Sequence, residues 1–188
     1  MRILRWEDYK VMPWKNGGGT TTEIAVFPPA SGLGGEPFQW RVSIADVATD
    51  GPFSKFNGYD RHIMLLDGQG MRLEIDEADA LDLLPFRPVS FSGDWTVSGL
   101  LTGGPVRDFN LMVARQFGRG SLICQMLSAP LPLIGDGATR LIHCIDGELS
   151  IGGHIVGSGE TAILSDMESA VLNPLLPEVL VALCTIHH

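Results

Sequence analysis

The segment Arg61-His-Ile-Met-Leu-Leu-Asp-Gly68 returns 79 residues later as Arg140-Leu-Ile-His-Cys-Ile-Asp-Gly147. In both copies an arginine precedes five mostly apolar residues and an Asp-Gly pair. An alternating stretch then follows, Met71–Ile75 in the first copy and Glu148–Gly152 in the second. A strand, an Asp-Gly turn and another strand predict a β-hairpin. The repetition predicts two similar β-rich lobes fused in one chain.

Glycine and proline interrupt the whole sequence at short intervals, with 23 Gly and 12 Pro among 188 residues. This spacing leaves room for about a dozen short strands and little else. Only Arg5–Tyr9 and Ala78–Leu84 have a plausible helical pattern. We therefore expect an all-β protein, built as a sandwich or as one or more barrels.

The overall charge excludes several classes of partner. The chain holds 22 acidic and 13 basic residues, which gives a net charge of −9. Nucleic-acid binders and proteins on anionic membranes need clustered Lys and Arg, so neither partner is expected. The sequence contains no apolar stretch of about 18 residues and no apolar segment after Met1, which predicts a cytoplasmic protein.

The charge is also unevenly distributed along the chain. Residues 1–72 contain eight basic and eight acidic side chains, whereas residues 73–188 contain five and fourteen and so carry the entire net charge. A site for a small anion is therefore expected within the first 72 residues.

Neither a metal site nor a hydrolase site is indicated. The three cysteines form no CxxC pair, and the sequence contains no HxH and no GxSxG motif. His143, Glu148 and His154 are metal-ligand residue types, but their spacing matches no known pattern. We expect no metal, no cofactor and no catalytic residue.

Four segments resemble one known family: Trp14–Glu23 (WKNGGGTTTE), Phe38–Ala45 (FQWRVSIA), Gly51–Gly70 with its GPFSKF start, and Asp108–Met112 (DFNLM). Together they are similar to the HutD/Ves family of the RmlC-like cupin superfamily. The resemblance implies a double jelly-roll bicupin, two fused cupin-type β-barrels. We place an N-terminal lobe with the ligand pocket at 1–112 and a C-terminal lobe at 113–188.

The resemblance also implies a function. On the HutD branch, the protein would bind a small carboxylate metabolite of histidine catabolism, of the N-formylglutamate or urocanate class, and regulate histidine utilisation without turnover. Two alternatives stay open. One is a metal-independent cupin enzyme, an isomerase or hydrolase, acting on a related metabolite, and the other is a stress-related protein of the Ves branch. A homodimer is compatible with either.

Arg61 is the first candidate ligand-binding residue. By strand alternation it shares a side with Ile63 and Leu65, which predicts that its guanidinium faces the interior or the mouth of a barrel. A guanidinium there needs an anion, and its planar fork suits a carboxylate. The alternative is an internal salt bridge, for which three acidic residues are available: Asp60, Asp67 and Glu23.

Arg41 and Ser43 share one side of the Phe38–Ala45 segment, opposite an apolar side. They form either the polar wall of the pocket or the solvent side of an amphipathic strand. Glu23 lies among mostly uncharged neighbours, where it would anchor Arg41 or Arg61 or contact an amide of the ligand.

The remaining candidates lie in turns or beside them. Lys15 and Asn16 precede three glycines that permit close backbone approach to an anion, and Trp14 would wall an apolar pocket; the alternative is a flexible loop. Phe53 belongs to an aromatic turn that is either a packed corner or a lid. Asn110 reaches the pocket or forms a turn.

Overall fold

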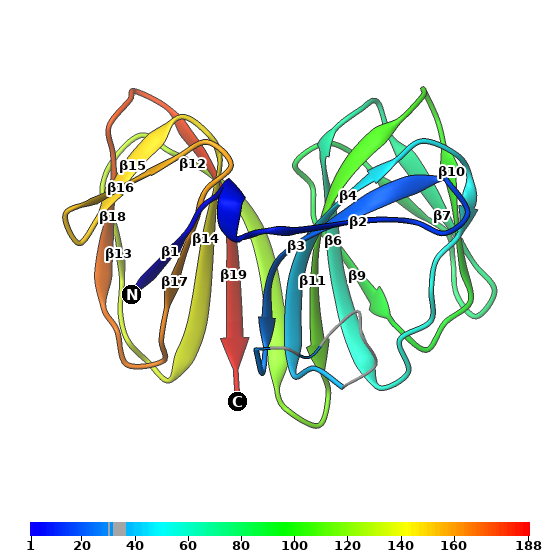
Figure 1. The fold of residues 1–188 in the computed structure, drawn as a ribbon, viewed down its shortest axis with the longest axis horizontal. Coiled ribbons are helices and arrows are strands. Elements are labelled where there is room, and N and C mark those ends of the chain that lie inside the picture. The colour runs from blue at the N-terminus through cyan, green and yellow to red at the C-terminus, as the bar shows by residue number, and fades with distance from the viewer. Residues whose placement is uncertain (30, 32–36) are drawn as a thin grey trace. The chain divides into compact units, whose positions relative to one another are not determined.

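The protein is described by a computed structural model that covers residues 1–29, 31 and 37–188. The expected all-β class is confirmed: these residues form nineteen strands, one short 3-10 helix and no α-helix. None of their helices is long and apolar enough to cross a membrane. Chain contacts divide the strands between two compact units (Figure 1).

The first unit, Lys10–Arg119, consists of two sheets. One has the strand order β2-β3-β4-β11-β6-β9, and the other the order β5-β10-β7-β8. The strands are β2 (Lys10–Pro13), β3 (Gly19–Phe27), β4 (Trp40–Val47), β5 (Gly51–Pro52), β6 (Tyr59–Asp67), β7 (Met71–Ile75), β8 (Leu81–Leu83), β9 (Val89–Ser92), β10 (Val97–Leu101) and β11 (Val106–Ala114).

The second unit combines Met1–Tyr9 with Gly120–His188. Its sheets have the orders β1-β17-β14-β19-β12 and β13-β18-β15-β16. The elements are β1 (Arg2–Leu4), η1 (Trp6–Asp8), β12 (Arg119–Leu127), β13 (Leu131–Leu133), β14 (Ala138–Asp146), β15 (Glu148–Ile151), β16 (His154–Gly157), β17 (Thr161–Leu164), β18 (Ala170–Pro174) and β19 (Val179–His187).

The same strand order occurs in both units. The first unit contains the orders β4-β11-β6-β9 and β5-β10-β7-β8. The second unit contains β12-β19-β14-β17 and β13-β18-β15-β16. Each of these strands of the second unit follows its counterpart by eight places in the strand numbering. The repeat found in the sequence is therefore part of a longer repeat that spans eight strands. The additional strands β2 and β3 extend the first copy, and β1 extends the second.

The Asp-Gly pairs connect different strands from those we predicted. A hairpin within one sheet is wrong, because β6 and β7 belong to different sheets of the first unit, as β14 and β15 do in the second. Gly68 and Gly147 have φ of +100° and +96°, where a side chain would be strained. Each glycine also packs against the first residue of a long strand, Val106 or Val179. The tight turn thus carries the chain from one sheet to the facing one.

Two further sequence predictions require correction. The Ala78–Leu84 segment contains β8 and no helix, because Leu73, Arg72 and Met71 of β7 pair with it across the sheet. The expected boundary after residue 112 would cut β11, which continues to Ala114. The first nine residues belong to the second unit, where β1 pairs with β17.

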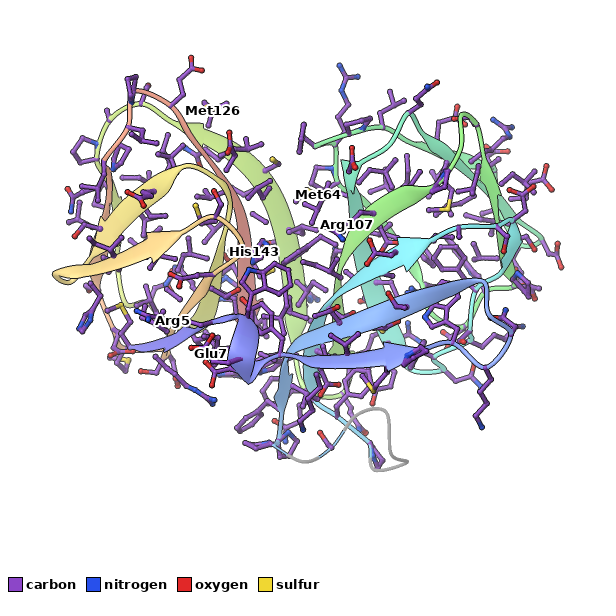
Figure 2. All side chains as sticks on the ribbon, turned by 45° about the horizontal axis from the view of Figure 1, so that its top comes forward. Arg5, Glu7, Met64, Arg107, Met126 and His143 are labelled. Carbon is purple, nitrogen blue, oxygen red and sulfur yellow. The ribbon has the colours of Figure 1, made fainter. Side chains whose placement is uncertain are left out.

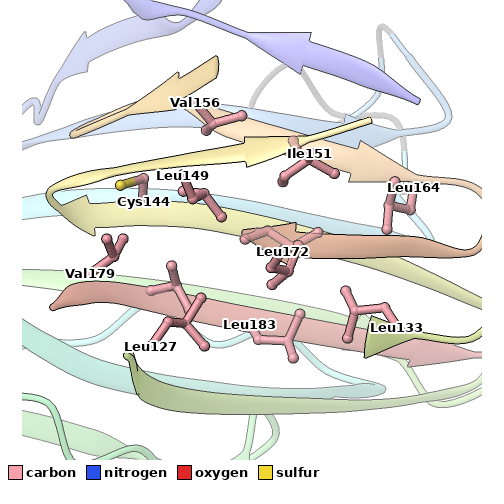
Figure 3. Packing of buried hydrophobic residues seen from close by; sticks show 13 residues of the cluster. Leu127, Leu133, Cys144, Leu149, Ile151, Val156, Leu164, Leu172, Val179 and Leu183 are labelled. Atoms are coloured by element: carbon pink, nitrogen blue, oxygen red, sulfur yellow. The ribbon is translucent and has the colours of Figure 1, made fainter. Parts of the chain in front are cut away.

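Each unit is held together by apolar side chains from both of its sheets. In the second unit this core comes from nearly every strand, and Figure 3 shows its thirteen members, among them Leu149, Leu172 and Leu183. In the first unit, Ile63 and Leu65 of β6 meet Met71 and Leu73 of β7. Burial of each such side chain contributes roughly 1.5–3 kcal/mol.

Gly19 provides a test of this packing. A methyl group added there would lie 2.2 Å from the carbonyl oxygen of Asp46, so we expect Gly19→Ala to lower the free energy of unfolding by about 1–3 kcal/mol. Gly51→Ala is the control, because its added methyl would meet nothing within 4 Å. Urea unfolding measures both variants, and equal losses would contradict the close packing of Gly19.

Candidate functional site

Polar side chains gather inside the first unit, where strand alternation alone predicts apolar ones. Seven polar residues of its described part are buried: Thr22, which alternates to the other side of β3, and the six residues Glu23, Arg41, Ser43, Arg61, Asp108 and Asn110. The latter six come from β3, β4, β6 and β11, which are neighbours in one sheet. On their own strands they share a side with core residues such as Ala45, Ile63 and Val106. We call these six residues the polar cluster.

Arg41 and Glu23 form a buried ion pair. The Nε of Arg41 donates to Oε2 of Glu23 at 3.0 Å, and the two side chains are only 3% and 6% exposed. Burial lowers the pKa of Arg41, while the charge and the hydrogen bond of Glu23 act against that decrease. The Nη2 of Arg41 has no hydrogen-bond partner among the described residues. This buried cation therefore still has a donor to offer.

Arg61 is enclosed by aromatic rings and contacts a neutral amide. Its Nη2 donates to Oδ1 of Asn110 at 3.1 Å, and its Nη1 to the carbonyl oxygen of Ser54 at 3.4 Å. The centroids of three rings lie 5.0–5.7 Å from its Cζ, those of Phe53, Phe56 and Phe91. Such cation–π contacts stabilise a guanidinium without neutralising its charge.

No carboxylate among the described residues forms a direct hydrogen bond with Arg61. Burial lowers its pKa to about 10, Asp108 acts against this decrease, and the nearby charge of Arg41 adds to it. Its Nε has no hydrogen-bond partner among the residues described. None of the three acidic residues considered as salt-bridge partners holds it: Glu23 pairs with Arg41, and Asp60 with Arg115. Arg61 is thus a buried cation with an unused donor.

Asp108 completes the cluster and is the residue that the sequence analysis missed. One of its carboxylate oxygens accepts a hydrogen bond from Nδ2 of Asn110. Burial raises the pKa of Asp108 to about 7, Arg61 opposes this rise, and Asp46 adds to it. Its position two residues before Asn110 on a strand was the available signal, because both must then face the same side.

The candidates of the β2–β3 turn lie at the other end of the sheet, whereas Phe53 packs against Arg61. Gly19, at the end of the β2–β3 turn, pairs with Val47 of β4. Arg41 lies six residues earlier on β4. Met112 of β11 lies between Arg41 and Arg61 and pairs with both. Six residues of strand span about 20 Å. The structure therefore does not bring Lys15 and Asn16, which are exposed in this turn, together with Arg61 around one small ligand.

The three glycines of this turn have structural explanations. Gly17 has a φ of +72°, and a methyl group on Gly18 would lie 2.9 Å from Oγ1 of Thr49. Asn16 accepts a hydrogen bond from the Gly18 amide. Trp14 packs against the apolar core and donates from Nε1 to Thr21 at 2.8 Å. These contacts account for the residues of the turn without a ligand.

The second unit contains the counterpart of Arg61 in a different state. Arg140 donates to Oδ2 of Asp136 at 2.7 Å and to the carbonyl oxygen of Ile134 at 2.9 Å. His143, labelled in Figure 2, is buried against Thr161, while Glu148 and His154 are exposed. Among the described residues, no group of three or more His, Cys, Asp or Glu is arranged to hold a metal.

Comparison with known proteins identifies the family. The family model HutD matches residues 6–177. The chain belongs to the HutD family. A relative from Pseudomonas putida, an uncharacterized 21.2 kDa protein in the hutC 3' region, is 44% identical over 151 residues, which are 80% of this chain and 77% of that protein. The protein Ves of Escherichia fergusonii is 39% identical over 58% of this chain and 57% of Ves.

Several solved structures match over the whole length of the chain. A conserved protein of unknown function, PA5104 of Pseudomonas aeruginosa PAO1, has a TM-score of 0.88 at 34% identity over 100% of this chain and 98% of that one. HutD from Pseudomonas fluorescens SBW25, in a formate condition, has a TM-score of 0.80 at 33% identity over 100% and 99%. YhhW of Escherichia coli, at 9% identity, covers 100% and 99% of the two chains with a TM-score of 0.73 and shares the fold alone.

The ion pair between Arg41 and Glu23 generates a prediction on stability. Glu23→Gln leaves a buried guanidinium without its counter-ion, which should cost about 3–5 kcal/mol of unfolding free energy. Asp82→Asn is the matched control, because it removes one partner of the exposed Arg72–Asp82 pair and should cost within about 1 kcal/mol. Urea unfolding measures both variants, and similar losses of unfolding free energy would contradict the larger contribution of the buried pair.

Proposed function

We propose that the polar cluster binds a small carboxylate metabolite of histidine catabolism, of the N-formylglutamate or urocanate class, and that binding without turnover regulates histidine utilisation. The observation that carries this proposal is the pair of unpartnered guanidinium nitrogens, Nη2 of Arg41 and Nε of Arg61, in buried side chains. Membership of the HutD family and the hutC-linked relative support the choice of pathway. The expected cytoplasmic location belongs to the same proposal.

Each residue of the cluster has a role in this proposal. A ligand carboxylate would accept hydrogen bonds from Arg41 and Arg61, while Ser43 and Asn110 supply neutral polar groups beside it. Phe53 and Phe56 lie over Arg61, so a ligand would reach the guanidinium by displacing them. They would then exclude water from the bound carboxylate. Lys15, Asn16 and Trp14 have no contact with the ligand in this revised site.

We also propose that each unit is a cupin-type jelly roll and that the chain is a double jelly roll. Eight strands per unit in the same order support this assignment. The likeness to YhhW and to AerE of Microcystis aeruginosa, which has a TM-score of 0.72 at 8% identity, supports it at the level of the fold.

One observation favours the enzymatic alternative. Burial raises the pKa of Asp108 to about 7. A carboxyl group with a pKa near neutral pH can both donate and accept a proton there. A metal-independent isomerase would need such a group beside its substrate. The experiment on ligand binding therefore includes a search for products.

We expect ligand binding to raise the melting temperature. At a hundredfold excess over the dissociation constant, the shift should be about 5–10 °C for a chain of this size. The panel consists of urocanate, N-formylglutamate, formiminoglutamate, glutamate and histidine. Each mixture is also analysed by mass spectrometry. Stabilisation without product supports the binding function, whereas a product supports the enzyme.

Two variants locate the site. Arg61→Lys keeps the charge but loses the planar fork, so it should remove most of the shift. Lys15→Ala, at the other end of the sheet, should keep the full shift. Loss of binding in Lys15→Ala with retention in Arg61→Lys would overturn the proposed site, and no shift with any member of the panel would overturn the proposed function.

A further inference from the structure

Asp108 differs from the other buried carboxylate in how it contacts its cation. Glu23 accepts a hydrogen bond directly from Arg41 at 3.0 Å. Asp108 reaches Arg61 only through the side chain of Asn110, whose amide group donates to Asp108 and whose oxygen accepts from Arg61. The charge of Asp108 is therefore held less firmly than that of Glu23, although it is only 1% exposed.

The charges of the cluster balance without a ligand. Two guanidinium groups, on Arg41 and Arg61, face two carboxylates, on Glu23 and Asp108. A ligand carboxylate would bring one more negative charge into a buried space. An uncompensated charge in such a place is costly, and a neighbouring titratable group then changes its protonation state. Binding thus requires one carboxyl group of the cluster to become neutral.

The surroundings of Asp108 indicate that it is the carboxyl group that becomes neutral. Arg61 on β6 is the cation beside it, Arg41 and Asp46 lie on β4, and Glu23 lies on β3. Arg61 favours the charged form of Asp108, whereas Asp46 opposes it. A ligand bound to Arg61 and Arg41 would take over part of the attraction of Arg61 and add a like charge. Glu23 keeps its direct hydrogen bond to Arg41, so Asp108 is the group that becomes protonated.

We propose that binding of a carboxylate ligand is coupled to the uptake of one proton by Asp108, so that the affinity falls as the pH rises. This inference rests on the proposed binding function. The ligand enters as an anion, the proton comes from solvent, and the net charge of the buried cluster stays at zero. Asp108 thus loses its negative charge when the carboxylate of the ligand enters the cluster.

The expected pH range follows from the unliganded protein. Burial raises the pKa of Asp108 to about 7, so below that pH the residue is already neutral and binding needs no further proton. Above it, each complex takes up close to one proton. The dissociation constant should then increase about tenfold between pH 7.5 and 8.5. Simple carboxylates, whose own pKa values lie near 4, do not titrate in this range.

The test uses calorimetric titration of the full chain with two probes, N-formylglutamate and formate. At pH 8, titrations in HEPES and in Tris differ in buffer ionisation enthalpy, and the difference in observed heat gives the number of protons taken up. We expect about one proton for the wild-type protein. Binding without proton uptake, with a dissociation constant independent of pH, would overturn this inference and leave the proposed function intact.

Asp108→Asn identifies the group. The amide resembles a neutral carboxyl group, so this variant should bind without proton uptake and with an affinity that is unchanged between pH 7.5 and 8.5. Asp82→Asn, which removes an exposed carboxylate, is the control and should keep the wild-type proton count. Proton uptake that persists in Asp108→Asn would overturn the assignment. Absence of binding of both probes to the wild-type protein would overturn the proposed function and this inference together.

Discussion

Two guanidinium groups are buried in the interior of the first unit, where each needs a counter-ion or another form of compensation. Arg41 is compensated by Glu23, whereas Arg61 contacts the neutral Asn110 and three aromatic rings. Replacement of a buried ion pair by well-packed apolar residues is often neutral or stabilising. Stability alone therefore does not explain why this interior holds charges. Recognition of an anion explains both arginines and their unpartnered nitrogens.

The second unit shows what the same strand order forms without this constraint. Its core consists of Leu, Ile, Val, Ala and Cys side chains, and the counterpart of Arg61, Arg140, is satisfied by Asp136 and a backbone carbonyl. The repeat thus preserves an arginine at the start of a long strand in both units. In the described part of the chain, the arginine of the first unit lies with buried polar groups on β3, β4 and β11, whereas the sheet of Arg140 buries the polar residues His143 and Thr161. The two units therefore differ in the side chains on their shared strands and in the additional strand β3, which supplies Glu23.

Local patterns in the sequence predicted about a dozen of the nineteen strands in the described residues, the repeat and the inward direction of Arg61, because alternation and turn residues act over a few positions. They failed where distant segments meet. The Asp-Gly pair appeared to close a hairpin, but the glycine connects two sheets because it packs on Val106 from a later strand. Lys15 and Arg61 were both predicted to bind the ligand, and only the register of β3 on β4 revealed their separation. Asp108 was missed because its burial depends on neighbours from other strands.

An experimental structure with bound N-formylglutamate would locate the ligand. We expect a ligand carboxylate within hydrogen-bond distance of both Nη2 of Arg41 and Nε of Arg61, with Phe53 and Phe56 moved or closed over it. A hollow of about 400 Å³ at the opposite end of the same sheet, lined in part by Gly19, Asp46 and Arg107, offers the alternative location. Ligand density there, with both arginines unchanged, would contradict the account.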